Sequence, residues 1–415
     1  MTTAPPVPPS DRERLQRRTA RVMLTSQVVA GAGLAAGVTV GALLAEDMLG
    51  SARFSGIAST LFTLGSAATA YSVGALSDRR GRRAGLGAGY LAATLGALGA
   101  VVAAALGSVV LLFAALAVYG AGSATNLQAR YAGGDLAPAS GRGRAISTVL
   151  LGTTVGAVAG PNLVAPAGQL AERVGLPPLA GPFAMAALAY AAAGLVITVW
   201  LRPDPLLTAR RLVRDEPSDV AQIAGPVRTD RAAVRLGGLV MVMTQLVMVA
   251  IMTMTPIHMR GHGHGLAATG LVIAVHIGGM YLPSPLSGRL ADRYGSRPVA
   301  AAAAVALLAA GVIAAATPPH SVVWLAVALG LLGLGWNLGL LAGTALVANA
   351  VSLAHRAGIQ GRVDVSVALA GATGGLSSGV VMAATSYAVL AIASGTAAAL
   401  VLTAALRARP ASESA

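Results

Sequence analysis

Apolar stretches of about 20 residues without a charged side chain recur along this chain of 415 residues. As a helix, such a stretch can cross the hydrocarbon layer of a bilayer, which is about 30 Å thick. Because lipid offers no hydrogen-bond partner to the backbone, a spanning chain must form helices or a closed barrel. A barrel would show short alternating segments instead. The sequence therefore predicts an all-α integral membrane protein.

Twelve segments are expected to span the membrane, in two groups of six. The first six are 22–45, 54–77, 84–107, 109–132, 144–168 and 179–201. The second six are 236–259, 267–290, 298–317, 321–347, 362–386 and 387–406. The polar segment 202–235 is interpreted as a linker, and 1–21 and 407–415 as tails. We expect two pseudo-symmetric six-helix bundles, one over 22–201 and one over 236–406.

The basic residues predict the orientation of the chain. All of them are arginines, and only Arg53, Arg173 and Arg260 fall on one side of the predicted spans. Segments that carry an excess of positive charge stay in the cytoplasm. Both termini and the linker are therefore expected on the cytoplasmic side of the inner or plasma membrane.

The composition also excludes several classes of protein. The chain has no cysteine, so it contains no disulfide and no thiolate metal site. Its net charge is +14, but the arginines fall in loops with few aromatic residues, so we expect no nucleic-acid partner. The sequence shows no nucleophile–base arrangement, so we expect neither an enzyme nor a bound cofactor. The expected partners of a monomer are membrane lipid and a small-molecule or metal-ion substrate.

Two similar segments follow the second and the eighth span. They read GALSDRRGRR (74–83) and GRLADRYGSR (288–297). The first resembles the G-x-x-x-D-R-x-G-R-R motif of the major facilitator superfamily, whose two six-helix halves are internal repeats with a substrate site between them. The candidate gating residues are Gly74, Asp78, Arg79, Gly81, Arg82, Arg130, Asp292, Arg293 and Asp364. We expect Asp78 to pair with Arg130 and to approach the N-terminus of the eleventh span near Asp364, closing the cytoplasmic side.

The fifth span contains GTTVGAVAGPNLVAPAG, which resembles a motif associated with antiporters. Gly156, Gly160 and Pro161 match it, whereas Val164 stands in place of a glycine. Small residues allow close helix packing, and a proline kinks a helix. Generic packing in a glycine-rich chain explains the pattern as well, so it assigns no direction of transport.

The stretch around the seventh and eighth spans concentrates methionine and histidine. Met248 and Met252 lie four residues apart on one span, and His276 and Met280 four apart on the next. Residues at this spacing share a helix face, and counting from the outer helix ends puts both pairs roughly 15 Å deep. Thioethers and imidazoles are donors for a soft cation such as Cu(I). Packing is the alternative for the methionines, whereas a titratable residue such as His276 inside a span is a functional candidate.

These two spacings resemble those of the CcoA-like copper importers of the same superfamily. The resemblance implies a copper site at Met248, Met252, His276 and Met280, with copper as the substrate and import as its direction. His258, Met259, His262 and His264 would then collect metal at the outer mouth. The alternative is a proton-coupled efflux antiporter of small organic compounds, drug-like or riboflavin-like. For that alternative Asn126, Trp336 and Asn337 lie in spans that could face a cavity, although only 4% of the residues are aromatic.

Overall fold

A computed structural model describes residues 11–34, 40–49, 55–214, 229–318 and 320–407. Its first half contains α1 (Asp11–Leu34), α2 (Gly41–Leu49), α3 (Ser55–Arg80), α4 (Arg82–Leu106), α5 (Val109–Tyr119), α6 (Ala121–Gly134), α7 (Arg142–Arg173) and α8 (Gly181–Trp200), with short 3-10 turns at Ala139–Gly141 and Pro178–Ala180. The linker contributes α9 (Pro205–Arg214). The second half contains α11 (Arg231–Gly261), α12 (Leu266–Tyr281), α13 (Ser284–Tyr294), α14 (Ser296–Ala316), α15 (Val322–Ala350), α16 (Arg356–Ala384) and α17 (Tyr387–Arg407). The described residues form helices and no strand.

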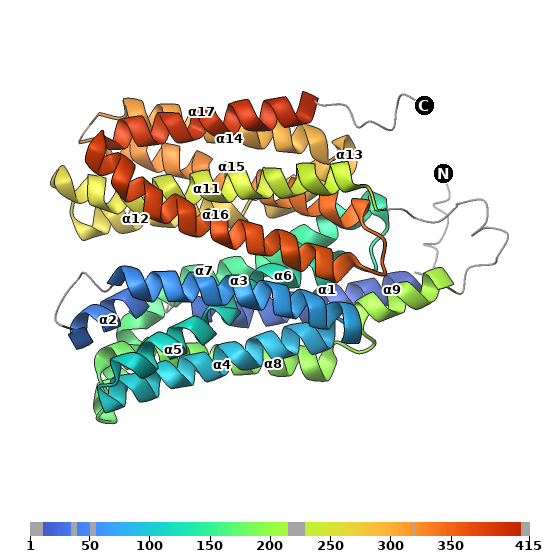
Figure 1. Cartoon of the computed structure of the whole chain (residues 1–415), viewed down its shortest axis with the longest axis horizontal. Helices are drawn as coiled ribbons and strands as arrows, with labels where there is room; N and C mark the ends of the chain where they lie inside the picture. Colours follow the sequence, from blue (N-terminus) through green and yellow to red (C-terminus); the bar gives the residue numbers. More distant parts are fainter. Residues whose placement is uncertain (1–10, 35–39, 50–54, 215–228, 319, 408–415) are drawn as a thin grey trace, which may run out of the picture.

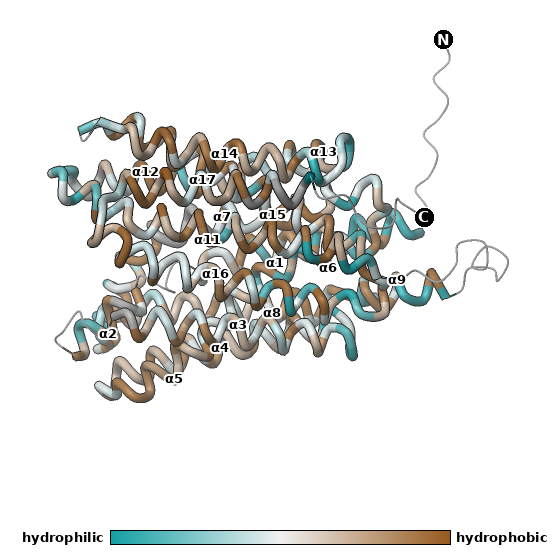
Figure 2. Tube along the Cα trace, turned by 45° about the horizontal axis from the view of Figure 1, so that its top comes forward, coloured by the Kyte–Doolittle hydropathy of each residue, from teal (hydrophilic) through white to brown (hydrophobic). Residues whose placement is uncertain are grey.

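The helices lie side by side along the long axis of the molecule (Figure 1). Hydrophobic residues dominate their middle parts, and hydrophilic residues gather towards the ends (Figure 2). By length and composition, eight helical segments of the described chain could each cross a membrane. The described part of each of the twelve predicted spans overlaps one helix or two consecutive helices, which confirms the all-α membrane fold.

Several helix ends differ from the sequence-based boundaries. The first helix already begins at Asp11, inside the segment predicted as a tail. Within the predicted linker, α9 is helical and α11 begins at Arg231. The carboxylate of Asp230 accepts hydrogen bonds from the N–H groups of Ala232 and Ala233, which satisfies two N–H groups that have no partner within the helix. A polar cap of this kind stabilises the start of α11, which lies before the apolar part of the helix.

The eighth predicted span is broken into α12 and α13 around Pro283. Proline lacks an N–H group and clashes with the carbonyl four residues earlier, so a regular helix cannot continue through it. Asn337 on α15 donates hydrogen bonds to the Met280 carbonyl and to the Ser284 hydroxyl, each 2.7 Å long. The Asn337 side chain is fully buried and satisfies polar groups at the break.

Each half has its own apolar core. One cluster of buried residues lies entirely within 22–201 and another entirely within 236–402. A third cluster joins Ile146 and Leu150 of α7 to residues of α11, α15, α16 and α17. The halves therefore meet partly through α7. We call the end of the molecule that carries α9, the α3–α4 turn and the α13–α14 turn the linker end (Figure 1).

A close backbone approach holds α1 against α7. A Cβ atom added to Gly156 would lie 2.4 Å from the Cα atom of Gly31, so neither helix has room for a side chain at this crossing. Gly160 and Pro161, which the sequence motif also includes, fall among the residues of α7 whose side chains lie outside the described part of the structure.

Candidate functional site

A cavity of about 470 Å³, which we call the central cavity, lies between the two halves. Its lining comes from α3 (Ser59, Thr60, Phe62, Thr63, Ser66), α6 (Ser123), α11 (Gln245, Val249, Thr253) and α16 (Ala368, Gly371, Ala372, Gly375, Leu376). These residues come from the middle of α11 and α16 and from the part of α3 distant from the linker end. All lining side chains that the structure describes are uncharged, so the cavity offers hydroxyl and amide groups beside apolar surface.

One amide in this cavity is fixed by its neighbours. Trp336 on α15 donates a hydrogen bond of 2.8 Å from Nε1 to the Gln245 Oε1 atom. The Gln245 Nε2 atom lies 3.1 Å from the position that a Cβ atom of Gly371 would take. Gln245 is therefore held by α15 with its amide nitrogen close to α16. Trp336 acts on the cavity through Gln245 and is not itself among the described lining residues.

At the linker end, Asp78 joins α3 to the start of α16. Its carboxylate accepts hydrogen bonds from the backbone N–H groups of Ala357 (2.9 Å) and Gly358 (2.8 Å). Arg210 on α9 donates to the same carboxylate at 2.9 Å. A carboxylate at a helix N-terminus is favoured by unpaired N–H groups and by the helix dipole. Asp78 therefore connects both halves with the linker helix.

Asp292 makes the equivalent contact in the second repeat. Located near the end of α13, it accepts hydrogen bonds from the N–H groups of Gly143 (2.7 Å) and Arg144 (3.0 Å) at the start of α7. Each motif aspartate thus caps the N-terminus of a helix in the opposite half. The neighbouring arginines Arg79 and Arg293 are exposed, and the guanidinium of Arg293 lies over the Tyr294 ring.

The motif glycines make these contacts possible. A Cβ atom on Gly74 would lie 2.8 Å from the Cα atom of Gly361, and one on Gly288 would lie 2.8 Å from the Gly143 carbonyl oxygen. The glycine after each aspartate, Gly81 or Gly295, adopts a positive φ of 88° or 85°, a conformation in which L side chains are strained. The two motifs therefore form matching backbone contacts between the halves.

Arg130 lies in a buried ion pair with Asp364, not with Asp78. Its Nη2 atom donates to Asp364 Oδ1 at 2.7 Å, and the two side chains are 0% and 2% exposed. The Tyr131 hydroxyl also donates to Asp364, and the Arg130 Nε atom donates to the Thr344 hydroxyl at 2.9 Å. The predicted Asp78–Arg130 pair is wrong, because the α16 N-terminus and Arg210 take up the described contacts of the Asp78 carboxylate.

A second buried cluster surrounds Arg82. Its guanidinium donates to Asp135 at 2.8 Å and to the side-chain oxygen of Gln360 on α16. Arg356 lies 4.0 Å from the same Asp135 carboxylate. The sequence motif identified Arg82 but not Asp135 or Gln360, because those two residues belong to no repeated pattern. Arg82 thus bridges the first half to α16.

The methionine and histidine residues predicted as a copper site lie on α11 and α12. Met248 and His276 are buried, at 8% and 2% exposure, and Met252 and Met280 are half-buried. The Nδ1 atom of His276 lies 2.9 Å from the Leu329 carbonyl oxygen on α15, whereas its Nε2 atom is buried without a hydrogen-bond partner in the described chain. Among the described lining residues of the central cavity, none of these four occurs. Met248, Met252 and Met280 pack instead in the apolar cluster that joins α7 to helices of the second half.

The residues predicted at the outer mouth lie at the end of α11. The His258 ring stacks on Tyr387 with 4.2 Å between centroids and lies 4.4 Å from the His262 ring. Met259 is fully buried, and His264 lies in the turn that follows α11. Within the residues that the structure describes, no group of three or more histidine and acidic side chains has an arrangement that could hold a metal ion.

The chain resembles known membrane transporters in sequence and in fold. It is 52% identical over 390 residues to the "Uncharacterized MFS-type transporter YdeG" of Bacillus subtilis, covering 93% of this chain and 91% of the relative. It is 27% identical over 355 residues to the riboflavin transporter RfnT of Brucella anthropi, covering 84% and 85% of the two chains. The structure of the proton:xylose symporter XylE is similar in fold, with a TM-score of 0.71, 14% identity, and coverage of 95% and 96%.

The family itself is identified by sequence. The model of the Major Facilitator Superfamily matches residues 22–282 and 238–415. Its members are multi-pass proteins that work in lipid as secondary transporters and not as enzymes. This match agrees with the repeated motifs and with the two helical halves that enclose a cavity. The chain belongs to the major facilitator superfamily of membrane transporters.

Proposed function

We propose that this transporter carries a small, uncharged organic molecule through the central cavity by alternating access. The observation that supports this proposal is the lining of the cavity, in which hydroxyl groups and the fixed amide of Gln245 stand beside apolar surface, with no charged side chain among the described lining residues. An ionic substrate would lose its hydration in such a cavity without gaining a counter-charge, which is costly. A neutral molecule with several hydrogen-bonding groups fits this surface.

One relative favours the same substrate class. The relative named as a riboflavin transporter, at 27% identity, suggests a neutral, hydroxyl-bearing molecule of the riboflavin kind as the first substrate to try. We further propose that the chain works as a monomer in the cytoplasmic membrane, with the linker end on the cytoplasmic side, since nearly all arginines lie there.

Gly371→Leu is expected to weaken substrate binding and transport about tenfold or more. The new side chain would enter the cavity, where even its Cβ atom would lie 3.1 Å from Gln245, and overfilling a packed site costs about 1–3 kcal/mol. The measurement is uptake of riboflavin, and of a panel of neutral and anionic solutes, into proteoliposomes.

Gly379→Leu is the matched control on the same helix. A Cβ atom at Gly379 meets nothing within 4 Å, so its variant should transport as the wild type does. If Gly371→Leu transports like the wild type, or if anionic solutes are transported better than neutral ones, the cavity is not the substrate site proposed here.

Copper remains a second candidate substrate because of one observation at His276. The Nε2 atom of His276 is buried and has no hydrogen-bond partner in the described chain, and Met280 follows His276 by four residues on α12. An imidazole nitrogen without a partner, together with thioether sulfur atoms, is a donor set for Cu(I). The import direction belongs to this candidate alone.

Copper accumulation in cells distinguishes the two candidates. If the substrate is a neutral organic molecule, cells that express the wild type, Met248→Ala or His276→Ala at equal levels should contain equal amounts of copper. A rise in copper with the wild type that both variants abolish would assign the protein to copper import. A fall with the wild type that both variants abolish would assign it to copper export.

A further inference from the structure

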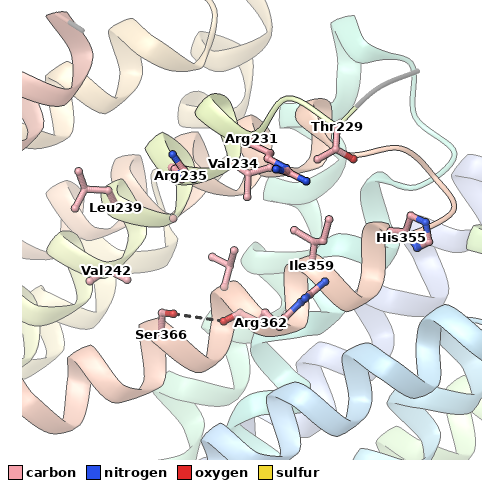
Figure 3. Close-up of a pocket in the computed structure, with 12 residues that line it drawn as sticks. Thr229, Arg231, Val234, Arg235, Leu239, Val242, His355, Ile359, Arg362 and Ser366 are labelled. Carbon is pink, nitrogen blue, oxygen red and sulfur yellow. Dashed lines mark hydrogen bonds between the residues drawn. The ribbon is translucent and has the colours of Figure 1, made fainter. Parts of the chain in front are cut away.

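A second cavity, of about 780 Å³, lies at the linker end between α11 and α16 (Figure 3). It shares no described lining residue with the central cavity. Arg231 and Arg235 of α11 and Arg362 of α16 contribute three positive charges to it, and His355 lies at its edge. We call this cavity the basic groove.

The charge of the basic groove is not balanced by the described residues that line it. No acidic side chain is among its described lining residues. In the described part of the chain, the guanidinium groups of Arg231, Arg235 and Arg362 take part in no ion pair. The neighbouring Asp230 directs its carboxylate to the N–H groups of Ala232 and Ala233 at the start of α11. The positive charge of the three arginines therefore favours the binding of an anion.

The groove continues from its arginines along an apolar wall. Leu239 and Val242 extend it along α11 (Figure 3), and Val363 follows Arg362 along α16. At 1.5 Å per residue, Val242 lies roughly 16 Å further along its helix than Arg231. Both helices are long and apolar enough to span a membrane. The wall therefore has the direction and the depth of a lipid acyl chain.

We propose that the basic groove binds one anionic phospholipid. The phosphate would lie among Arg231, Arg235 and Arg362, where guanidinium groups form strong, bidentate hydrogen bonds to phosphate oxygens. An acyl chain would cover Leu239, Val242 and Val363. A soluble anion would satisfy the arginines but leave this wall exposed, whereas a zwitterionic lipid would cover the wall but provide no net negative charge.

The test is native mass spectrometry of the purified full chain with phosphatidylglycerol or phosphatidylcholine of identical acyl chains. We expect the wild type to bind phosphatidylglycerol more tightly. Each arginine near a lipid phosphate contributes roughly fivefold to affinity, so Arg362→Gln should weaken phosphatidylglycerol binding roughly fivefold. The triple variant Arg231→Gln/Arg235→Gln/Arg362→Gln should remove the preference. A matched triple variant with the same loss of charge, Arg211→Gln/Arg214→Gln/Arg289→Gln, should retain it, since those exposed arginines lie outside the groove.

A second variant tests the apolar wall without changing the charge. A Cβ atom on Gly238 would make an ordinary contact of 3.7 Å with Val363, so Gly238→Ala should bind lipid as the wild type does. Gly238→Leu would fill the groove and should weaken phosphatidylglycerol binding.

Three results would overturn the proposal. Equal losses in both triple variants would show unspecific charge attraction. If Gly238→Leu binds phosphatidylglycerol as the wild type does, and soluble glycerol phosphate competes with this binding, the groove is a site for a dissolved anion. Equal binding of the two lipids by the wild type would show that the groove does not select an anionic lipid.

Discussion

Replacing Arg130 with methionine is expected to destabilise the protein by about 3–5 kcal/mol, because the change leaves the buried carboxylate of Asp364 without its counter-charge. The pair is 2.7 Å long and its side chains are 0% and 2% exposed. The Tyr131 hydroxyl, at 3.3 Å, is the remaining described donor to that carboxylate oxygen. A hydroxyl cannot replace a guanidinium as partner of a buried negative charge.

A double-mutant cycle measures this effect. Asp364→Asn in the Arg130→Met background should recover much of the lost stability, because the second change removes the uncompensated charge. The thermal midpoint of the purified protein, followed by tryptophan fluorescence, provides the comparison.

The control for this cycle is the pair between the exposed Arg144 side chain and Asp292, which is 10% exposed. Arg144 is 65% exposed and lies 3.6 Å from the carboxylate, so Arg144→Met should cost less than about 1 kcal/mol. If the two single variants have the same midpoint, or if the double variant is no more stable than Arg130→Met, the Arg130–Asp364 pair does not act as a buried ion pair.

Gly74→Ala is expected to open the linker end. Its new Cβ atom would lie 2.8 Å from the Cα atom of Gly361 and 2.9 Å from the Ala357 carbonyl oxygen, and neither backbone atom can move independently of α16. Separation of α3 from α16 would also stretch the hydrogen bonds from α16 to Asp78. Hydrogen bonds to a charged group contribute about 1.5–3 kcal/mol each, so losing one shifts the equilibrium about tenfold or more towards the open state.

Spin labels on either side of the interface report this opening. Because the chain contains no cysteine, Arg80→Cys on α3 and Arg293→Cys on α13 can be labelled without removing native thiols. Both positions are exposed at the linker end. The variant should shift the distance distribution to longer values and reduce transport.

Gly270→Ala provides the control, since a Cβ atom there meets nothing within 4 Å. Its distance distribution should match that of the wild type. An unchanged distribution in Gly74→Ala would mean that the glycine contact does not hold the linker end closed.

The membrane fold and the two repeats could be predicted from the amino-acid sequence alone. Apolar runs without charge can satisfy their backbone in lipid only as helices, so the twelve spans followed from composition and length. The repeated motifs likewise predicted matching positions for Asp78 and Asp292, which lie near the ends of α3 and α13, each followed by a glycine with positive φ. These properties depend on neighbouring residues in the chain.

Tertiary packing decided which side chains meet. Arg130 pairs with a residue 234 positions away, and the imidazole of His276 bonds to the Leu329 carbonyl on α15. The cavity is lined by serines and threonines that look like ordinary packing residues in a chain rich in small side chains. In lipid both the interior and the exterior of a bundle are apolar, so hydrophobic periodicity gives little information about which helix face points inwards. The rotation of each helix, and with it the partners of Arg130 and the lining of the cavity, is set by contacts between distant helices.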